Sequence, residues 1–265
     1  MKTATDPELQ KIIEDNSSGS KEILFNLNRY FLKTGFANLR EPAETLKYLK
    51  SRFTDFAAIQ NYIQKLLYAL DEDKLCEAEK LISNFEKNEQ SKIQKIYSSF
   101  KPYFTGKNSI VTISNSFTLL NIFKLLNRDI NNLSITVSEA RPNCEGKIFS
   151  ENLAAESINV NLITEAMIPG AVKECGAVII GADSILSNGN AINKTGSLSL
   201  AIACKHYGKP FYVIADKSKM KQDSVFYEEE KNPAEIYSGQ SSNIRTKNFY
   251  FEEIDNKLIT KIFTD

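Results

Sequence analysis

The chain has 265 residues, of which 42% are hydrophobic, and its 33 Lys and Arg balance 33 Asp and Glu. It is long enough to bury a sizeable core, and its overall charge favours neither a nucleic-acid partner nor an acidic membrane surface. Its four cysteines form no Cys-x-x-Cys pair, which indicates a reducing compartment rather than a disulfide scaffold or a structural zinc site.

The first part of the chain shows apolar side chains at helical spacing. Such stripes run through residues 23–31, 46–56, 59–70, 75–85 and 93–100. Serines precede the first stripe and Pro42 lies near the start of the second, as is typical of helix beginnings. We predict a helical domain over residues 1–105, with no strand.

From Gly106 onward, short β-rich runs alternate with helical ones. The expected strands are 109–113, 134–138, 159–163, 177–180, 211–214 and 248–251, and the helices between the first five are 116–127, 145–157, 166–174 and 197–207. This alternation predicts the α/β class, with a doubly wound, mostly parallel sheet over residues 106–265. Ligands of such sheets lie beyond the carboxyl ends of the strands, so the residues after each strand are the site candidates.

After the first strand, the segment Ser114-Asn115-Ser116-Phe117-Thr118 leads into an apolar helix. Small hydroxyl and amide side chains, free backbone N–H groups and the positive end of the helix dipole can together cradle a phosphate. The alternative is ordinary N-capping by Ser114 or Ser116, which the spacing alone favours.

After the second strand, Arg141 can bind a phosphate or carboxylate with both guanidinium nitrogens, and Pro142 stiffens the turn behind it. The alternative is a surface pair between Arg141 and Glu139, which would contribute little to stability. The sequence leaves these two interpretations even.

Asp183 follows the fourth strand, and it can act as a general base if its pocket raises its pKa. The alternative is an aspartate that binds the following turn. Lys194 can meet a phosphate as a point charge or lie on a solvated helix start. After the fifth strand, Lys217 or Lys219 can close over an anion.

Several patterns are absent from the sequence. It lacks G-x-G-x-x-G and the P-loop motif, so we expect neither a dinucleotide nor any other cofactor, and no metal. The one histidine, His206, lies at a predicted helix end, which leaves no Ser-His-Asp triad. Residues 1–7 hold no apolar export signal and no apolar run can span a bilayer, so we expect a cytoplasmic protein without a membrane partner.

Four blocks of sequence, taken together, resemble one family. They are Glu-Ala-Arg-Pro-Asn-Cys-Glu-Gly (139–146), Gly-Ala-Asp-Ser-Ile-Leu-Ser-Asn-Gly (181–189), Asn-Lys-Thr-Gly-Ser (193–197) and Gly-Lys-Pro-Phe-Tyr-Val (208–213). The family is shared by the α, β and δ regulatory subunits of translation initiation factor 2B, 5-methylthioribose-1-phosphate isomerase and ribose-1,5-bisphosphate isomerase. The likeness runs through residues 109–219, and residues 230–235 resemble a later family element. It implies a helical domain on a Rossmann-like domain, assembled as homodimers or higher homo-oligomers.

In isomerases of that family an aldose phosphate becomes a ketose, with a cysteine after the first strand and the aspartate of Gly-Ala-Asp as the catalytic pair. The resemblance places Asp183 at this aspartate, and Asn193 and Lys194 at an Asn-Lys pair that contacts substrate. The cysteine position holds Ser114, and a hydroxyl is a far weaker acid than a thiol. Cys144 is a candidate replacement, although a cysteine packed as a small hydrophobe is commoner.

Two further departures concern the phosphate. Glu145 stands where the isomerases have glutamine, and the sequence has no Arg-Gly-Ala near its start, where their substrate phosphate is partly held. A carboxylate beside a phosphate adds repulsion unless Arg141 or Lys147 compensates.

We therefore predict an initiation-factor-2B-like protein that binds a sugar phosphate or nucleotide monophosphate without isomerase activity. The expected ligand-binding residues are Ser114, Asn115, Ser116, Thr118, Arg141, Glu145, Asn193 and Lys194. The alternative is an aldose–ketose isomerase acting on methylthioribose-1-phosphate or ribose-1,5-bisphosphate, with Asp183 catalytic. A third possibility is a structural subunit with a vestigial pocket.

Overall fold

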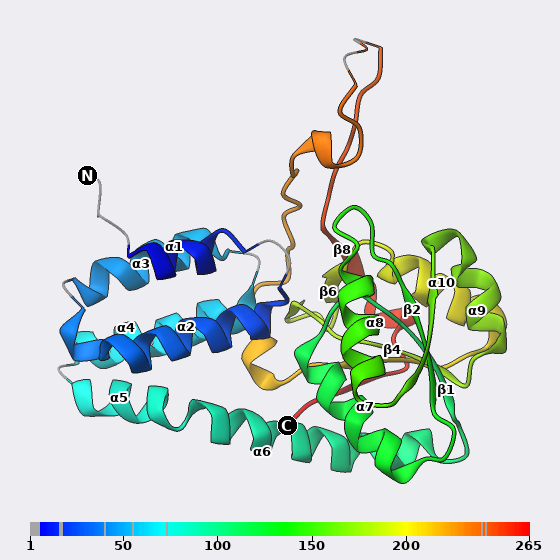
Figure 1. The fold of residues 1–265 in the computed structure, drawn as a ribbon, viewed down its shortest axis with the longest axis horizontal. Coiled ribbons are helices and arrows are strands. Elements are labelled where there is room, and N and C mark those ends of the chain that lie inside the picture. Colours follow the sequence, from blue (N-terminus) through cyan, green and yellow to red (C-terminus); the bar gives the residue numbers. More distant parts are fainter. Residues whose placement is uncertain are drawn as a thin grey trace.

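The computed structural model describes residues 6–15, 18–39, 41–54, 56–72, 74–239, 241 and 243–265. Residues 1–5, part of the segment in which we expect no export signal, lie outside these ranges. Figure 1 shows a group of helices beside an α/β sheet.

The helical part packs its apolar stripes into one core. Its helices are α1 (Pro7–Ile13), α2 (Ser20–Thr34), α3 (Pro42–Arg52), α4 (Ala57–Asp71), α5 (Leu75–Ser83) and α6 (Phe85–Phe100). Leu27, Leu49 and Leu66 are fully buried in this core, as their helical spacing predicts. No strand occurs here among the described residues up to Phe104, in agreement with the sequence.

The sheet is parallel and doubly wound. Within the described residues its strand order is β3-β2-β1-β4-β7-β9, formed by β1 (Ser109–Ile113), β2 (Ser134–Ser138), β3 (Asn159–Ile163), β4 (Ala177–Ile180), β7 (Phe211–Ile214) and β9 (Lys261–Phe263). The order reverses between β1 and β4, so the crevice expected of such sheets lies beyond the carboxyl ends of these two strands.

Helices cover both faces of the sheet. α6, α7 (Phe117–Asp129) and α8 (Glu145–Ala155) share a core with Ala177 and Ile179 of β4, whereas α9 (Ile168–Glu174) and α10 (Ser197–Tyr207) share the opposite core with Val178 and Ile180. Because β4 is buried on both faces, it reads as a continuous apolar run. The predicted α/β class is thus confirmed, with the first five expected strands at their expected positions.

The sixth expected strand, at 248–251, was misplaced. The observed strand is β8 (Phe251–Ile254), and it belongs to a separate antiparallel sheet with β5 (Ser184–Ile185) and β6 (Ala191–Lys194). Asn188-Gly189 forms the turn of a β5–β6 hairpin, whose strands are too short to show a periodic pattern. The pairing of β6 with β8 places Lys194 opposite Phe251.

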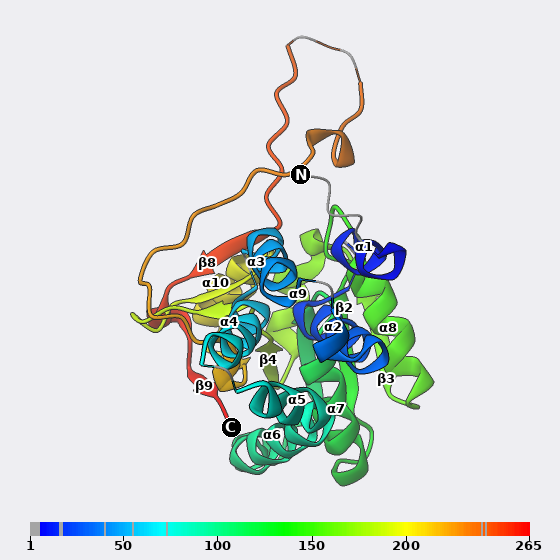
Figure 2. The ribbon, with the colours of Figure 1, turned by 90° about the vertical axis from the view of Figure 1, so that its left-hand side faces the viewer.

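The segment between β7 and β8 forms an arm that leaves the body of the molecule and returns beside β6. Figures 1 and 2 both show it projecting beyond the helices and the sheet. At its base the backbone N–H of Lys231 donates to the carbonyl of Asn248 at 2.8 Å. The division of the chain at residues 105 and 106 stays a prediction, because α6 lies in both cores, with Phe85 in one and Phe100 in the other.

Gly146 sets how closely α8 approaches the end of β2. A Cβ at this position would lie 1.9 Å from the carbonyl oxygen of Ser138, so no larger residue fits without moving backbone. The close approach fixes Glu145, the first residue of α8.

We expect Gly146→Ala to lower the free energy of unfolding by about 2 kcal/mol or more, since the clash is with backbone. Denaturant unfolding measures the loss. The matched control is Gly170→Ala in α9, where an added Cβ meets nothing within 4 Å. Equal stability of the two variants would contradict the close packing described here.

Candidate functional site

A cavity of about 430 Å³ opens at the carboxyl ends of β1 and β4. Its walls come from three parts of the chain: the strand ends, the helical part and the base of the arm. The strand-end wall includes Ser114, Asn115, Ser116, Glu145, Gly181, Ala182, Asp183, Asn193 and Lys194. The other walls include Gly19, Ser20, Lys21, Arg52, Lys219, Lys231, Asn232, Glu235 and Tyr250.

The cavity brings together most of the residues that the sequence nominated, but not all. Thr118 is buried in the first turn of α7 and Arg141 is exposed in the loop after β2, and neither lines the cavity. Lys219 lines it and Lys217 does not. Cys144 is also outside the wall, and its thiol faces the carbonyl of Pro142 at 3.7 Å.

The turn after β1 uses its small polar residues for structure and leaves them facing the cavity. Ser114 has a left-handed backbone with φ of 69°, which is uncommon for a residue other than glycine and marks a tight turn. Ser116 caps α7 by accepting from the N–H of Leu119 at 3.3 Å, as the capping interpretation predicts. It also lines the cavity, so capping and a place in the site coexist.

Lys194 and Glu145 form a buried ion pair. The Nζ of Lys194 lies 2.8 Å from the Oε1 of Glu145, and the two side chains are 15% and 4% exposed. The same Nζ lies 4.7 Å from the ring centre of Tyr250 and 4.8 Å from that of Phe251. Lys194 is thus held by one carboxylate and two aromatic faces rather than by solvent.

The surroundings of Glu145 disfavour the ionised form of its carboxyl group. Burial raises the pKa of the Glu145 carboxyl, the Lys194 ammonium opposes that rise, and the nearby Asp183 carboxylate adds to it. Ser114 favours the charged form through a hydrogen bond. The net result is a carboxyl whose pKa lies above its usual value, in contact with the cavity.

Hydrogen bonds fix the turn between β6 and α10. Asn193 donates through Nδ2 to the hydroxyl of Ser197 at 2.8 Å, and this hydroxyl donates to the carbonyl of Lys194 at 2.7 Å. Glu252 accepts from the backbone N–H groups of Gly196 and Leu198, both at 2.7 Å. The start of α10, which would otherwise attract an anion, is therefore occupied by a carboxylate of the chain itself.

Asp183 lies beside a buried lysine. Its backbone N–H donates to the carbonyl of Ile192 at 2.8 Å, and the residue is 9% exposed. Lys219 is also buried, and its ammonium donates to the carbonyl of Ala182. Burial lowers the pKa of Lys219, whereas the Asp183 and Asp216 carboxylates oppose that change. The sequence named Lys219 only as an alternative to Lys217.

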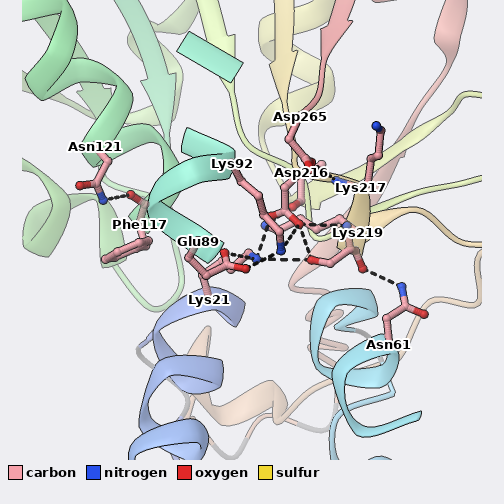
Figure 3. Close-up of polar contacts among 12 residues, drawn as sticks. Lys21, Asn61, Glu89, Lys92, Phe117, Asn121, Asp216, Lys217, Lys219 and Asp265 are labelled. Atoms are coloured by element: carbon pink, nitrogen blue, oxygen red, sulfur yellow. Dashed lines mark hydrogen bonds and ion pairs between the residues drawn. The ribbon is translucent and has the colours of Figure 1, made fainter. Parts of the chain in front are cut away.

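A network of buried charges joins the helical part to the sheet (Figure 3). Lys21 of α2 lies 2.6 Å from Glu89 of α6 and 2.8 Å from Asp216, which follows β7. Lys92 adds a contact of 2.5 Å to Glu89. Burial alone would raise the pKa of Asp216, but Lys21 and Lys92 outweigh it and hold this pKa well below its usual value.

Sequence reasoning missed this network, although one signal was present. Lys21 shares a helical face with Leu24, Asn28 and Phe31, all of which are buried. A lysine on such a face requires a partner in the interior. The network holds Lys21 at the cavity wall.

The fold and the cavity define a class: an α/β protein in which a helical layer and a doubly wound sheet enclose a polar pocket at the topological switch point. The chain belongs to the initiation factor 2 subunit family, whose sequence model matches residues 9–265. The family expected from the sequence is thereby confirmed.

Relatives of this chain include both initiation-factor-like proteins and isomerases. A translation initiation factor eIF-2B subunit 2-like protein of Pyrococcus furiosus is 32% identical over 156 residues, which make up 59% of this chain and 55% of that protein. A ribose 1,5-bisphosphate isomerase of Archaeoglobus fulgidus is 27% identical over 163 residues, 59% of this chain and 52% of the relative. A methylthioribose-1-phosphate isomerase of Trichormus variabilis is 37% identical over 139 residues, 48% of this chain and 40% of the relative. The chain spans about half the length of the curated relatives it matches.

Solved structures share the fold. The translation initiation factor eIF-2B of Pyrococcus horikoshii has a TM-score of 0.78 at 22% identity, covering 96% of this chain and 92% of that one. A chain of the tetrameric eIF2B-β2-δ2 complex of C. thermophilum has a TM-score of 0.75 at 14% identity, covering 98% and 91%. Among the described residues of this chain, no helix combines the length and apolarity needed to cross a membrane.

We expect Asp216→Asn to lower the free energy of unfolding by about 3 kcal/mol, because it leaves Lys21 buried with one counter-charge fewer. The pKa of Asp216 is depressed in the folded state, so its contribution is present above the usual value of 3.8 and is lost as the pH falls below it. Denaturant unfolding across this pH range measures both effects.

The matched control is Glu8→Gln, which removes an exposed pair with Lys33 whose side chains are 47% and 70% exposed. We expect it to change stability by less than about 0.5 kcal/mol. If Asp216→Asn costs no more than this control, the network does not hold the two parts together.

Proposed function

We propose that this protein is an initiation-factor-2B-like member of its family that binds a sugar phosphate or a nucleotide monophosphate without isomerising it. The observation that carries the proposal is the cavity at the ends of β1 and β4, which is lined by Ser114, Asp183, Asn193 and Lys194. The volume of about 430 Å³ suits a small ligand of this kind.

The lining favours a polar, anionic ligand that also carries hydroxyl groups. Arg52 brings positive charge from α3, and Lys21, Lys219 and Lys231 also line the cavity, each in contact with an acceptor of the chain itself. Serine hydroxyls and the amides of Asn115 and Asn232 can exchange hydrogen bonds with sugar hydroxyls. Thr118 and Arg141 contribute to ligand binding in this proposal only if the ligand reaches beyond the cavity wall.

The proposed lack of isomerisation rests on proton transfer. Converting an aldose into a ketose moves a proton between neighbouring carbon atoms and another between their oxygen atoms, so it needs groups that accept and donate protons at those atoms. Asp183 can serve as one of these groups. Ser114 is a poor second group because its hydroxyl holds its proton at neutral pH, and Cys144 lies outside the wall.

The second candidate function is an aldose–ketose isomerase acting on a ribose-1-phosphate-type substrate. Similarity to proteins named methylthioribose-1-phosphate isomerase and ribose 1,5-bisphosphate isomerase favours it. The position of Asp183 in the cavity, beside the buried Lys219, also favours it. In this alternative Asp183 is catalytic and a group other than a cysteine completes the pair.

We also propose that residues 106–265 form the ligand-binding domain and the contact between copies in a homodimer or higher homo-oligomer. The family's tetrameric eIF2B-β2-δ2 complex, which shares this fold, supports assembly of this kind. Light scattering of the purified protein measures the number of copies.

A ligand screen tests the proposed function. We expect ribose-1,5-bisphosphate, methylthioribose-1-phosphate or AMP to raise the melting temperature, because a ligand at about 100 times its Kd stabilises the folded state by about 2.7 kcal/mol. Asp183→Asn removes a charge from the cavity wall and should change this response, whereas the exposed Lys33→Met should not. No response to any phosphorylated ligand would count against the proposal.

Proton NMR of the same mixtures separates the two functions. We expect the aldose phosphates to remain unconverted after incubation with the wild type. Conversion to a ketose by the wild type, lost in Asp183→Asn, would establish the isomerase instead.

A further inference from the structure

In one corner of the cavity, the cation that could bind an incoming phosphate is already paired with a carboxylate of the chain. It consists of Ser114, Glu145, Asp183, Lys194 and Tyr250, and we call it the Glu145 corner. Lys194 is its cation, but this ammonium is paired with Glu145 at 2.8 Å and lies over the ring of Tyr250 at 4.7 Å. The positive charge of Lys194 is therefore already balanced by Glu145. A ligand anion can pair with this ammonium only if Glu145 moves away from it.

We infer that the Glu145 corner is a hydroxyl-binding subsite, in which Glu145 accepts hydrogen bonds from ligand hydroxyls and excludes the ligand's phosphate. The inference rests on the proposed function, because it orients a phosphorylated ligand within the same cavity. It assigns to Glu145 the role of a specificity-determining residue.

The charges around Glu145 support exclusion of an anion. Lys194 faces it from β6, Asp183 from the loop after β4, Ser114 from the turn after β1 and Tyr250 from the residue before β8. Glu145 is thus matched by Lys194, and Asp183 interacts with the buried Lys219, so neither ammonium is left without a carboxylate of the chain. An anion entering here gains no excess positive charge and meets the carboxylate of Glu145 inside a poorly solvated pocket, where repulsion is strong.

Burial of Glu145 also explains why it selects hydroxyl groups. The side chain is 4% exposed and is contacted by Lys194 and Ser114, so its carboxylate has little access to bulk water. A ligand hydroxyl can donate a hydrogen bond to this carboxylate without bringing a charge into the pocket. An ionised phosphate oxygen has no proton to donate. A vicinal diol of a pentose fits this requirement, and the phosphate of the same ligand then lies away from Glu145.

The neighbouring helix start follows the same pattern. Glu252 occupies the backbone N–H groups of Gly196 and Leu198 at the beginning of α10. A second carboxylate of the chain therefore fills a position near Lys194 that would otherwise attract a phosphate.

Sulfate is a suitable probe because it stays ionised throughout the useful pH range. We expect calorimetric titration at pH 7.5 to show sulfate binding at least about tenfold tighter in Glu145→Gln than in the wild type, since the amide removes the repulsion and frees Lys194. The matched control is Glu139→Gln, which removes a carboxylate that lies outside the cavity and pairs with Lys147 at 3.4 Å. It should behave as the wild type.

The pH dependence gives a second readout. Protonation of Glu145 removes its charge, so sulfate binding should tighten more steeply with falling pH in the wild type than in Glu145→Gln, where Lys219 and the other cavity groups still titrate. Equal sulfate binding by the two proteins, with the same pH dependence in both, would overturn the inference.

A pair of sugar phosphates tests whether Glu145 binds the hydroxyl groups of the ligand. We expect the wild type to bind ribose 5-phosphate about tenfold more tightly than 2-deoxyribose 5-phosphate, and Glu145→Gln to lose most of this preference. A preference that survives in the variant would contradict the role of Glu145. If neither sugar phosphate binds to the wild type while the sulfate results hold, the charge exclusion is supported and the proposed function fails.

Discussion

The cavity depends on the buried contact between Lys21, Glu89 and Asp216. Lys21 comes from α2, Glu89 from α6 and Asp216 from the end of β7, so three elements distant in sequence share one set of charges. Each charge is costly to bury alone, and their mutual attraction offsets that cost only when all three are in place. The arrangement therefore favours one way of seating the helical layer on the strand ends, and the cavity lies between those two parts.

The same principle of internal pairing governs the cavity wall. Lys194 is paired with Glu145 and Lys219 donates to the carbonyl of Ala182, so these two lysines of the wall have partners within the chain itself. Neither ammonium therefore depends on a ligand for a partner. The selectivity of the cavity then comes from which ligand groups can replace or add to these contacts, and hydroxyl groups do so at a lower electrostatic cost than anions.

The sequence predicted the parallel sheet well because buried parallel strands appear as short apolar runs between amphipathic helices. It failed at β5, β6 and β9, which have two to four residues each and show no period. At the cavity, Asp183 was nominated because it follows a strand, and Asn193 and Lys194 because they match an Asn-Lys pair of the family; all three line the cavity. The Lys21 network was missed because its partners are far apart in the chain, as with Lys21 and Ser218, which are 197 residues apart and lie within hydrogen-bond distance. No local pattern carries such a pairing.

The pairing of Glu145 with Lys194 bears on the proposal that Ser114 stands at the cysteine position of the family's isomerases. A missing thiol alone would leave a substrate site that lacks one proton-transfer group, and another acid could restore it. Glu145 alters the charge of the site as well, so a phosphate would meet a different field even if the acid were restored. In the proposed function these two features act together, because Ser114 determines the acidity at this corner and Glu145 determines its charge.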